Sequence, residues 1–311
     1  MRAVELMDTT LRDGAQGEGV EFSLDDKRKI ARLLDRLGIP FIEGGNPASN
    51  PKDEALFGEY RQNAFLKCAE LIPFGSTCRA GSDPATDAGL LALLATERPI
   101  ISLFGKAHLL HVTDVLRVSP EENLRMIEQS IAFLTSNGRR VFFDAEHFFD
   151  GCAHDHAYAF AALRAAARGG AERLILCDTN GGTLPDDLRA RACEVQAAMP
   201  EARFGVHCHD DMGLALAGTL SCLQAGFVQA QGTITGIGER CGNTNLCALI
   251  PTLQLKLDMT SIPSENLPLL TPVTRSVIEL MNLTPNRRAP YVGYSAFAHN
   301  GGMHIDAVSK N

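Results

Sequence analysis

Short apolar runs alternate with longer segments of helical periodicity over most of the chain. Parallel strands that are covered on both faces form such nearly continuous apolar runs, because neither face is exposed to water. The pattern predicts strands at residues 4–9, 41–45, 71–76, 100–105, 141–146, 174–179, 204–209 and 227–233. It therefore predicts an alternating order of strands and helices.

The helices between these strands carry start and stop signals. Ser23 followed by Asp26 resembles a capping box, with Asp in place of the usual Glu or Gln, and Gly38 is placed to end that helix. Ser119 and Pro120 suit the N-cap and the first position of another helix. Helical patterns also cover residues 157–167 and 214–225. The predicted strands are thus followed by helical stretches.

The number of these units bounds the fold. Eight strands that each precede a helical stretch, within about 260 residues, match the size of a (β/α)8 TIM barrel. A doubly wound open sheet also alternates strands and helices, but it usually has a glycine-rich phosphate-binding turn after its first strand. Here the first strand leads into the charged pair Arg12 and Asp13. The sequence therefore favours the α/β barrel.

The pattern changes after Asp258. Prolines become frequent, and proline interrupts regular structure because it lacks a backbone donor. Within this part only residues 274–283 have a helical pattern. We expect a catalytic barrel over residues 1–258 and, over residues 259–311, a linker with the start of a C-terminal helical subdomain.

The composition is that of a globular protein and narrows the classes of partner. The 311 residues include 29 Lys and Arg against 37 Asp and Glu, a net charge of −8 that disfavours nucleic acid as a partner. Apolar runs stay well short of the roughly 20 residues that span a bilayer. The first eight residues lack the apolar core of a signal peptide. Nine cysteines without a C-x-x-C pair suit reduced thiols, so we expect a cytoplasmic protein that binds neither nucleic acid nor a membrane.

Two histidines near the end of the seventh predicted strand suggest a metal site. Functional groups of a TIM barrel lie at the C-terminal ends of its strands. His207 and His209 are two residues apart, so their side chains point to the same face. Asp13 is the best third ligand, because the first and seventh strands flank the eighth in a closed barrel. This donor set suits Zn²⁺, Mn²⁺ or Fe²⁺; the alternative is a pair of hydrogen-bonded core histidines.

Other polar residues at strand ends have two interpretations. Arg12 could hold a carboxylate or stabilise an alkoxide beside a metal, although an isolated arginine is more often solvated. Asp8 we expect to be a structural cap or turn group. The glycines of residues 236–243 fit either a tight turn or a phosphate cradle, and Asn243 could also be the N-cap of the eighth helix. The cysteines lie mostly beside apolar residues, and we assign them no catalytic role.

Three motifs resemble those of a known superfamily. They are DTTLRDGAQ (8–16), HCHDD (207–211) and GIGERCGN (236–243). Together they resemble the DRE-TIM metallolyases and, within them, the branch of 2-isopropylmalate, homocitrate and citramalate synthases. Further segments are most similar to the citramalate synthase group: IEGGNP (42–47), SNPKD (49–53), FGK (104–106), FDAEHFFDG (143–151) and CDTNGGTLP (177–185). Asn46 and His108 stand where we expect tryptophan in that group.

The resemblance implies a set of site residues. Four residues match the ligands of a divalent metal, Mg²⁺, Mn²⁺ or Zn²⁺: Asp13, His207, His209 and Asn243. Arg12 matches the residue that polarises the 2-oxo group, and Thr179 matches the hydroxyl that holds the carboxylate of the 2-oxoacid. Glu146 matches an acid near the reacting centre, and His304 matches a histidine implicated in acid/base chemistry.

The same resemblance implies the reaction. Acetyl-CoA would undergo a Claisen-type condensation with a 2-oxoacid, most closely pyruvate, to give citramalate and CoA for isoleucine and other branched-chain amino-acid biosynthesis. The enzyme would be an acyltransferase and a homodimer. The alternatives are a 2-isopropylmalate or homocitrate synthase, a hydroxymethylglutaryl-CoA lyase, and a non-catalytic metal-binding barrel. The lyase is disfavoured because residues 238–240 resemble the synthase loop.

Relatives of this group continue beyond the barrel with a helical subdomain and a regulatory domain. The sequence ends seven residues after His304, at Asn311. Chain ends without packing partners fray, and a small displacement of a reacting group greatly slows a reaction. On this basis we expect binding of metal and pyruvate, weak condensation activity and no feedback inhibition.

Overall fold

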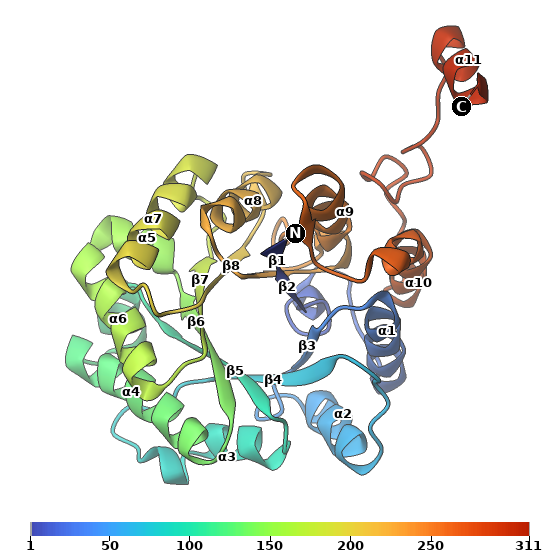
Figure 1. Ribbon diagram of the computed structural model, residues 1–311. Helices are drawn as coiled ribbons and strands as arrows, with labels where there is room; N and C mark the ends of the chain where they lie inside the picture. The colour runs from blue at the N-terminus through green and yellow to red at the C-terminus, as the bar shows by residue number, and fades with distance from the viewer. Residues whose placement is uncertain (1, 311) are drawn as a thin grey trace.

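The protein is a closed eight-stranded barrel surrounded by helices (Figure 1). The computed structural model describes residues 2–310, apart from the side chain of His304. The barrel strands follow one another in chain order from β2 to β9, and β9 pairs with β2 to close the circle. All of these pairings are parallel. The predicted (β/α)8 fold is confirmed, and the open sheet is excluded because the two end strands pair.

The barrel strands overlap the predicted runs. They are β2 (Glu5–Asp8), β3 (Phe41–Gly45), β4 (Glu70–Ser76), β5 (Ile100–Lys106), β6 (Arg140–Glu146), β7 (Arg173–Asp178), β8 (Phe204–Cys208) and β9 (Gln229–Gly232). A second sheet pairs β1 (Arg2–Ala3) with β10 (Met259–Thr260). Two residues are too few to give a detectable alternation, so the sequence did not predict this sheet.

Helices follow the strands and form the outer ring in Figure 1. They are α1 (Leu24–Leu37), α2 (Pro51–Gln62), α3 (Ala88–Ala95), α4 (Pro120–Ser136), α5 (Phe148–His154), α6 (His156–Gly169), α7 (Pro185–Ala198), α8 (Ala215–Ala225), α9 (Leu246–Lys256) and α10 (Leu270–Leu280). A last helix, α11 (Gly302–Lys310), lies outside this ring. The predicted caps are present: Ser23 and Asp26 form a reciprocal capping box, and Ser119 caps α4. Gly38 ends α1 at a φ of 95°, which glycine adopts without strain.

Three details of the helices differ from the sequence prediction. Residues 274–283 are not the only helical segment after Asp258, because α11 is helical as well. The N-cap of α9 is Asn245, whose side chain accepts from the backbone of Cys247, so the N-cap alternative for Asn243 is wrong. Helix α10 begins at Leu270 and ends at Leu280, earlier than the predicted 274–283. Pro272 lies in the first turn of this helix, where backbone N–H groups have no intrahelical acceptor and proline is tolerated.

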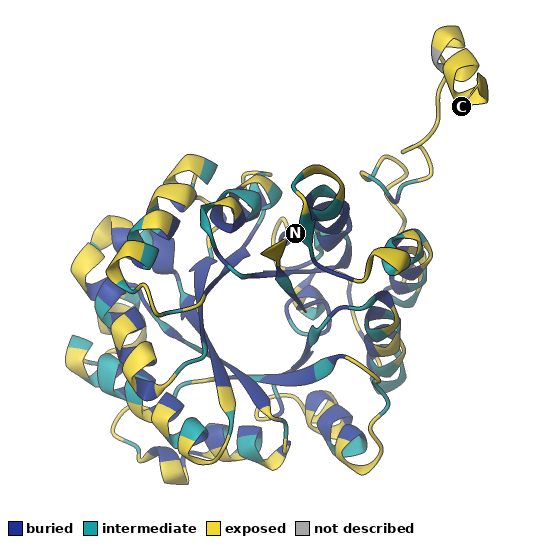
Figure 2. Ribbon diagram, viewed as in Figure 1, coloured by how far each residue is buried: buried dark blue, intermediate teal, exposed yellow. Residues whose placement is uncertain are grey.

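The apolar core forms two layers. The larger layer lies between the strands and the helices, and Figure 2 shows the barrel strands as mostly buried. Inside the barrel a separate cluster contains Met7, Ile72, Ile100 and Phe142. The guanidinium of Arg173, at the start of β7, makes two hydrogen bonds to Glu5, at 2.9 and 3.0 Å. These groups fill the N-terminal end of the barrel and leave the C-terminal end for polar side chains.

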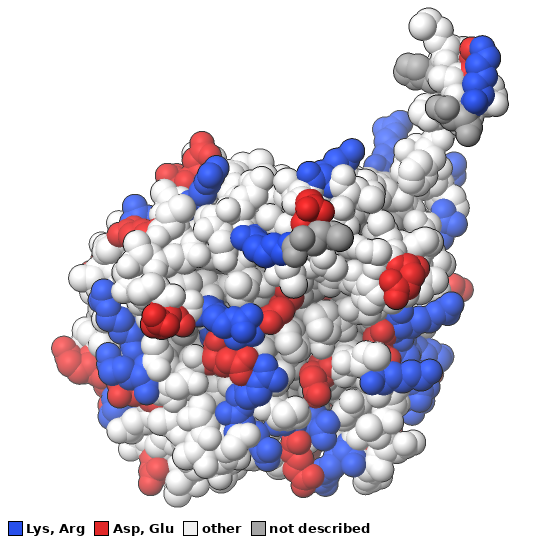
Figure 3. Space-filling view, viewed as in Figure 1, with Lys and Arg blue, Asp and Glu red and all other residues white. Residues whose placement is uncertain are grey.

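The chain after the barrel packs on α1 and then leaves the barrel. Helix α10 contacts α1, and Asn266 donates to the carbonyls of Arg36 and Leu37. Helix α11 stands apart from the barrel in Figure 1. In the face seen in Figure 3, acidic and basic side chains are interspersed. Among the helices of residues 2–310, none is both long and apolar enough to cross a membrane.

A buried ion pair fixes the loops that follow β2 and β3. Lys27 pairs with Asp53, and its ammonium also donates to the carbonyls of Leu11 (2.9 Å) and Gly44 (3.1 Å). Burial lowers the pKa of Lys27, although the charge of Asp53 opposes this effect. Gly45 has a φ of 133°, and a Cβ there would lie 2.2 Å from Asp53. The pair thus holds the backbone immediately before Arg12.

We predict that Lys27→Ala lowers the free energy of unfolding by about 3–5 kcal/mol, because it leaves the Asp53 carboxylate buried without its partner. Lys29→Ala is the matched control, since Lys29 pairs with Asp25 on the surface, and it should change stability by about 0.5 kcal/mol or less. Urea denaturation monitored by circular dichroism measures both values. Equal effects of the two substitutions would show that the buried pair does not stabilise these loops.

Candidate active site

A cavity of about 220 Å³ lies at the C-terminal end of the barrel. Side chains from several strand ends line it: Arg12, Asp13, Gln16, Phe74, Phe104, Asp144, Glu146, Cys177, Thr179, His207, His209 and Glu239. Six residues proposed from the sequence are therefore brought together in one cavity: Arg12, Asp13, Glu146, Thr179, His207 and His209. The expectation that functional groups gather at this end of the strands is met.

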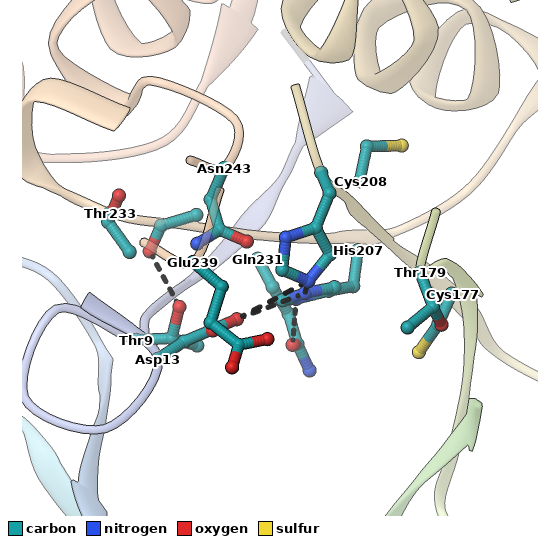
Figure 4. Close-up of polar contacts among 12 residues, drawn as sticks. Thr9, Asp13, Cys177, Thr179, His207, Cys208, Gln231, Thr233, Glu239 and Asn243 are labelled. Atoms are coloured by element: carbon teal, nitrogen blue, oxygen red, sulfur yellow. Dashed lines mark hydrogen bonds and ion pairs between the residues drawn. The ribbon is translucent and has the colours of Figure 1, made fainter. Parts of the chain in front are cut away.

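Asp13, His207 and His209 form a compact cluster. Figure 4 shows Asp13 beside His207. A tight turn after β2 places Asp13, whose backbone N–H donates to the carbonyl of Thr9 at 2.8 Å. Asp13 Oδ2 lies 3.2 Å from His207 Nε2 and 3.9 Å from His209 Nε2, and the two Nε2 atoms are 3.4 Å apart. As predicted, β2 and β8 flank β9, and this adjacency brings Asp13 to the histidines.

These three atoms fit a divalent cation. Ligand atoms lie about 2.0–2.2 Å from a first-row divalent ion, so two neighbouring ligands are about 3.0–3.5 Å apart. The observed separations are close to this range. Asp13 Oδ2 is also buried, and within the described residues it has no well-aligned hydrogen-bond donor. A buried carboxylate oxygen of this kind suits a cation better than a pair of core histidines alone.

Asn243 offers a further oxygen beside the cluster. The backbone of Asn243 forms a β-bridge with His209, and the side-chain Nδ2 of Asn243 donates to the carbonyl of Ile237 at 3.2 Å. Its Oδ1 is buried and has no hydrogen-bond partner in the described part of the chain. A Cβ at Gly238 would lie 2.0 Å from Asn243 Nδ2, so a larger residue there would displace the Asn243 side chain. Gly242 has a φ of 95°, which favours the tight-turn interpretation of the loop.

Arg12 is held in place at the edge of the cavity. Its Nε donates to Glu43 Oε2 at 2.5 Å, and its guanidinium lies 4.0 Å from the centre of the Phe74 ring. The side chain is only 15% exposed, so the alternative of a solvated arginine is wrong. Arg12 and Phe74 also line a neighbouring cavity of about 280 Å³. The guanidinium therefore faces two adjoining cavities.

Thr179 and Glu146 line another side of the cavity. Glu146 is the last residue of β6, and Thr179 directly follows β7. Thr179 Oγ1 accepts from the backbone N–H of His147 at 2.8 Å, which leaves its own proton for another acceptor. The Thr179 carbonyl accepts from Arg240 at 2.7 Å. Glu146 Oε2 is 2.5 Å from the ammonium of Lys106. Both side chains are thus oriented by neighbouring groups.

Burial and neighbouring charges shift the pKa values of Asp13, His207 and His209. Burial alone would raise the pKa of Asp13, but Arg12 and the two imidazoles outweigh it and hold the pKa well below its usual range. Burial lowers the pKa of His207, but Asp13 outweighs this effect and raises it. Burial and the charge of His207 lower the pKa of His209 to about 4. An ionised Asp13 and a neutral His209 are the forms that bind a metal.

Asp8 and Asp144 are two further buried acids near the ends of barrel strands. Asp8 accepts from the backbone N–H and the hydroxyl of Thr10, at 2.9 and 3.0 Å, which confirms its predicted turn role. Burial raises the pKa of Asp8 to about 7. Asp144 is also buried, and burial together with the charge of Glu43 raises its pKa. Both carboxyl groups are therefore close to the midpoint of their ionisation at neutral pH.

Two buried polar residues were not selected from the sequence. Glu43 pairs with Arg12, and Gln231 contacts His207. Gln231 lies two residues after Gln229 in the predicted eighth strand, so the alternation that identified the histidine pair could have found it. His304 lies in α11, which stands apart from the barrel in Figure 1, and its side chain lies outside the described residues.

Residues 3–269 match the HMGL-like family. The chain is 49% identical to the (R)-citramalate synthase of Synechocystis over 98% of its length, and 48% identical to that of Aquifex aeolicus over 99%. A 2-isopropylmalate synthase of Halalkalibacterium halodurans is 32% identical over all of the chain. The chain spans 57%, 58% and 59% of these three relatives.

Solved structures share the fold at low sequence identity. A Bacillus subtilis HMG-CoA lyase has a TM-score of 0.77 at 21% identity, covering 93% of this chain and 97% of that one. A second HMG-CoA lyase, from an Acinetobacter baumannii complex with coenzyme A and 3-methylmalate, has a TM-score of 0.77 at 18% identity, covering 96% and 98%. At these identities the similarity establishes the barrel fold alone.

We predict that the stability of Asp8→Asn relative to wild type rises with pH. The pKa of folded Asp8, about 7, exceeds its ordinary value of 3.8, so this group stabilises the wild type at low pH and loses that contribution as the pH rises through 7. Asparagine cannot ionise. The free energy of unfolding of Asp8→Asn relative to wild type should therefore rise by about 1.4 kcal/mol for each pH unit between the two pKa values. Urea denaturation at pH 5 and pH 8 measures it; a difference independent of pH would show that Asp8 is not held neutral.

Proposed function

Because the chain belongs to the HMGL-like family, we propose that it catalyses a metal-dependent Claisen-type condensation of acetyl-CoA with a 2-oxoacid. We propose pyruvate as the preferred 2-oxoacid and citramalate as the product. The observation that carries the proposal is the convergence of Asp13, His207 and His209 beside Arg12 in one cavity. The (R)-citramalate synthases at 45–49% identity support the choice of substrate.

Four residues would hold the metal: Asp13, His207, His209 and Asn243. A bound divalent cation, Mg²⁺, Mn²⁺ or Zn²⁺, would polarise the keto group of the 2-oxoacid as a Lewis acid. Asp13 Oδ2 and Asn243 Oδ1 are buried without a hydrogen-bond partner in the described part of the chain, which supports this ligand set. The carboxylate of Asp13 also compensates part of the positive charge that a cation would bring into the buried cluster.

Arg12 would bind the developing alkoxide. Glu43 accepts a hydrogen bond from Nε of Arg12. The N–H groups on the two terminal nitrogens can therefore donate to an oxygen of the substrate. The Phe74 ring and Glu43 fix the guanidinium before the reaction, and a preorganised donor stabilises the transition state without a cost of reorganisation. The hydroxyl of Thr179 would donate to the carboxylate of the 2-oxoacid.

Glu146 and His304 would provide proton transfer. Lys106 orients Glu146 toward the cavity, where the carboxylate can exchange a proton with the reacting centre. The base removes a proton from the methyl group of acetyl-CoA, the carbanion forms the new C–C bond to the keto carbon, and the resulting alkoxide takes up a proton. Water then hydrolyses the thioester to a carboxylate and releases CoA as the thiol. We assign His304 to acid/base chemistry from the segment after the barrel, and we propose that the active form is a homodimer.

The same proposal divides the chain into a catalytic barrel (1–258) and a linker with the start of a helical subdomain (259–311). Nine free cysteines support a reducing, cytoplasmic location. A 2-isopropylmalate synthase is the second candidate, since such enzymes are 32–33% identical to the chain. We place it second because the (R)-citramalate synthases are more similar to the chain, at 45–49% identity.

We predict one Mn²⁺ ion bound per chain, and loss of this binding in Asp13→Ala and His207→Ala, because each removes one of the converging ligands. His156→Ala is the matched control, since His156 is exposed and pairs with Glu194. Elemental analysis and calorimetric titration give the stoichiometry and the affinity. Wild-type metal content in both ligand variants would refute the metal assignment.

We also predict faster CoA release with pyruvate than with 2-oxoisovalerate or 2-oxoglutarate. One or two additional methylene-sized groups change discrimination by about 1–3 kcal/mol in such a pocket, or roughly 10–200-fold. The measurement is thiol release from acetyl-CoA in the presence of each 2-oxoacid, with the 2-oxoacid omitted as the control. A higher kcat/KM for 2-oxoisovalerate would reassign the chain to the second candidate.

A further inference from the structure

An amide side chain inside the barrel contacts a proposed metal ligand. Gln231 lies in β9 and is fully buried. Inward-facing positions of barrel strands are usually Val, Ile or Leu, so a buried glutamine there needs hydrogen-bond partners. Gln231 is paired in register with Met7, a member of the apolar cluster inside the barrel. Its Nε2 lies 3.7 Å from the Met7 sulfur, and its Oε1 lies close to His207, so the side chain contacts both that cluster and a proposed metal ligand.

The side chain of Gln231 bridges two polar groups. Its Oε1 lies 2.9 Å from His207 Nδ1, and its Nε2 donates to Asp144 Oδ1 at 3.1 Å. Figure 4 shows the Gln231 amide beside the His207 ring, joined by a dashed line. The three groups thus form a chain from the barrel interior to the cluster of Asp13 and the two histidines.

The direction of this chain determines which imidazole nitrogen is protonated. A carboxylate oxygen accepts hydrogen bonds, so the NH₂ group of Gln231 faces Asp144 and its carbonyl oxygen faces His207. A carbonyl oxygen can only accept, so His207 Nδ1 is the donor. In the neutral imidazole the lone pair then lies on Nε2. Nε2 is the atom that approaches Asp13 and His209.

We propose that Gln231 is a positioning residue that fixes the tautomer and ring orientation of His207 for metal binding, with Asp144 anchoring its amide. This inference rests on the proposed metal site. His209 provides a contrast, because its Nδ1 is buried without a hydrogen-bond partner among the described residues. The structure therefore assigns His207 as the preordered imidazole ligand, and His209 as the one that the ion itself must orient.

The first test compares two glutamines of the same strand. Gln231→Met keeps the length of the side chain but removes both hydrogen bonds. Gln229→Met is the matched control: Gln229 is buried two residues earlier, faces the same side, and neither of its amide atoms has a partner within residues 2–310. Loss of an outer partner of a metal ligand typically weakens metal binding about 10–100-fold.

Calorimetric titration with Mn²⁺ gives the affinities. We expect a Kd about 10–100-fold weaker for Gln231→Met and within about threefold of wild type for Gln229→Met. Equal affinities of the two variants would overturn the proposal. Absence of Mn²⁺ binding by the wild-type protein would instead refute the metal site on which the proposal rests, so the two failures are distinguishable.

Two substitutions of Asp144 separate its hydrogen bond from its charge. Asp144→Asn keeps an oxygen that can accept from Gln231 but removes the charge, whereas Asp144→Leu removes both. We expect Asp144→Asn to bind Mn²⁺ within a few fold of wild type and Asp144→Leu to resemble Gln231→Met. Equal weakening in both Asp144 variants would contradict the anchoring role, because charge alone would then explain the effect.

A spectroscopic measurement needs no substitution, so it remains decisive even if Gln231→Met does not fold. In the metal-free wild-type protein, at a pH at which the His207 imidazole is neutral, ¹⁵N-resolved NMR should show the proton on Nδ1, the nitrogen that lies 2.9 Å from Gln231 Oε1. A proton on Nε2 of His207 would overturn the proposal.

Discussion

The carboxylate of Asp13 determines the electrostatics of the barrel mouth. Asp13 is 2% exposed and lies between the guanidinium of Arg12 and the imidazoles of His207 and His209. A negative charge in this position is retained only because positive groups surround it, and they keep the pKa of Asp13 far below its usual range. The same charge orients the imidazole nitrogens toward one point. The cluster, the placement of Arg12 and the proposed cation all depend on this arrangement.

The barrel supplies the geometry that this interaction requires. The pairing of β2 with β9 places the turn that carries Asp13 close to the histidines. On the other side of β9 lies β8, which contains His207 and is followed directly by His209. Lys27 and Asp53 fix the loops beside Arg12, and Glu43 fixes its guanidinium. Gln231 approaches His207 from inside the barrel. Rigid strands and buried polar partners therefore surround the cluster on each side, which is how a preorganised site is built.

The fold and the centre of the site could be predicted because both depend on local patterns. Apolar runs gave all barrel strands, and a two-residue spacing placed His207 and His209 on one face. Features that depend on contacts between distant residues could not be predicted in this way. The shift of the α9 cap from Asn243 to Asn245 follows from the loop that carries Asn243 over the cluster. The pairing of Glu43 with Arg12 required the packing of two strands. Thr179 and Glu146 were expected from their places at strand ends, and the resemblance suggested their roles. The structure explains their orientation through His147 and Lys106.

A crystal structure of the protein loaded with Mn²⁺ would test the central claim most directly. The anomalous signal of manganese locates the ion independently of the protein atoms. The account predicts a peak about 2.0–2.3 Å from Asp13 Oδ2, His207 Nε2 and His209 Nε2, with Asn243 Oδ1 as the next protein oxygen. A fully loaded crystal with no peak among these residues, or with peaks only at surface carboxylates, would contradict it.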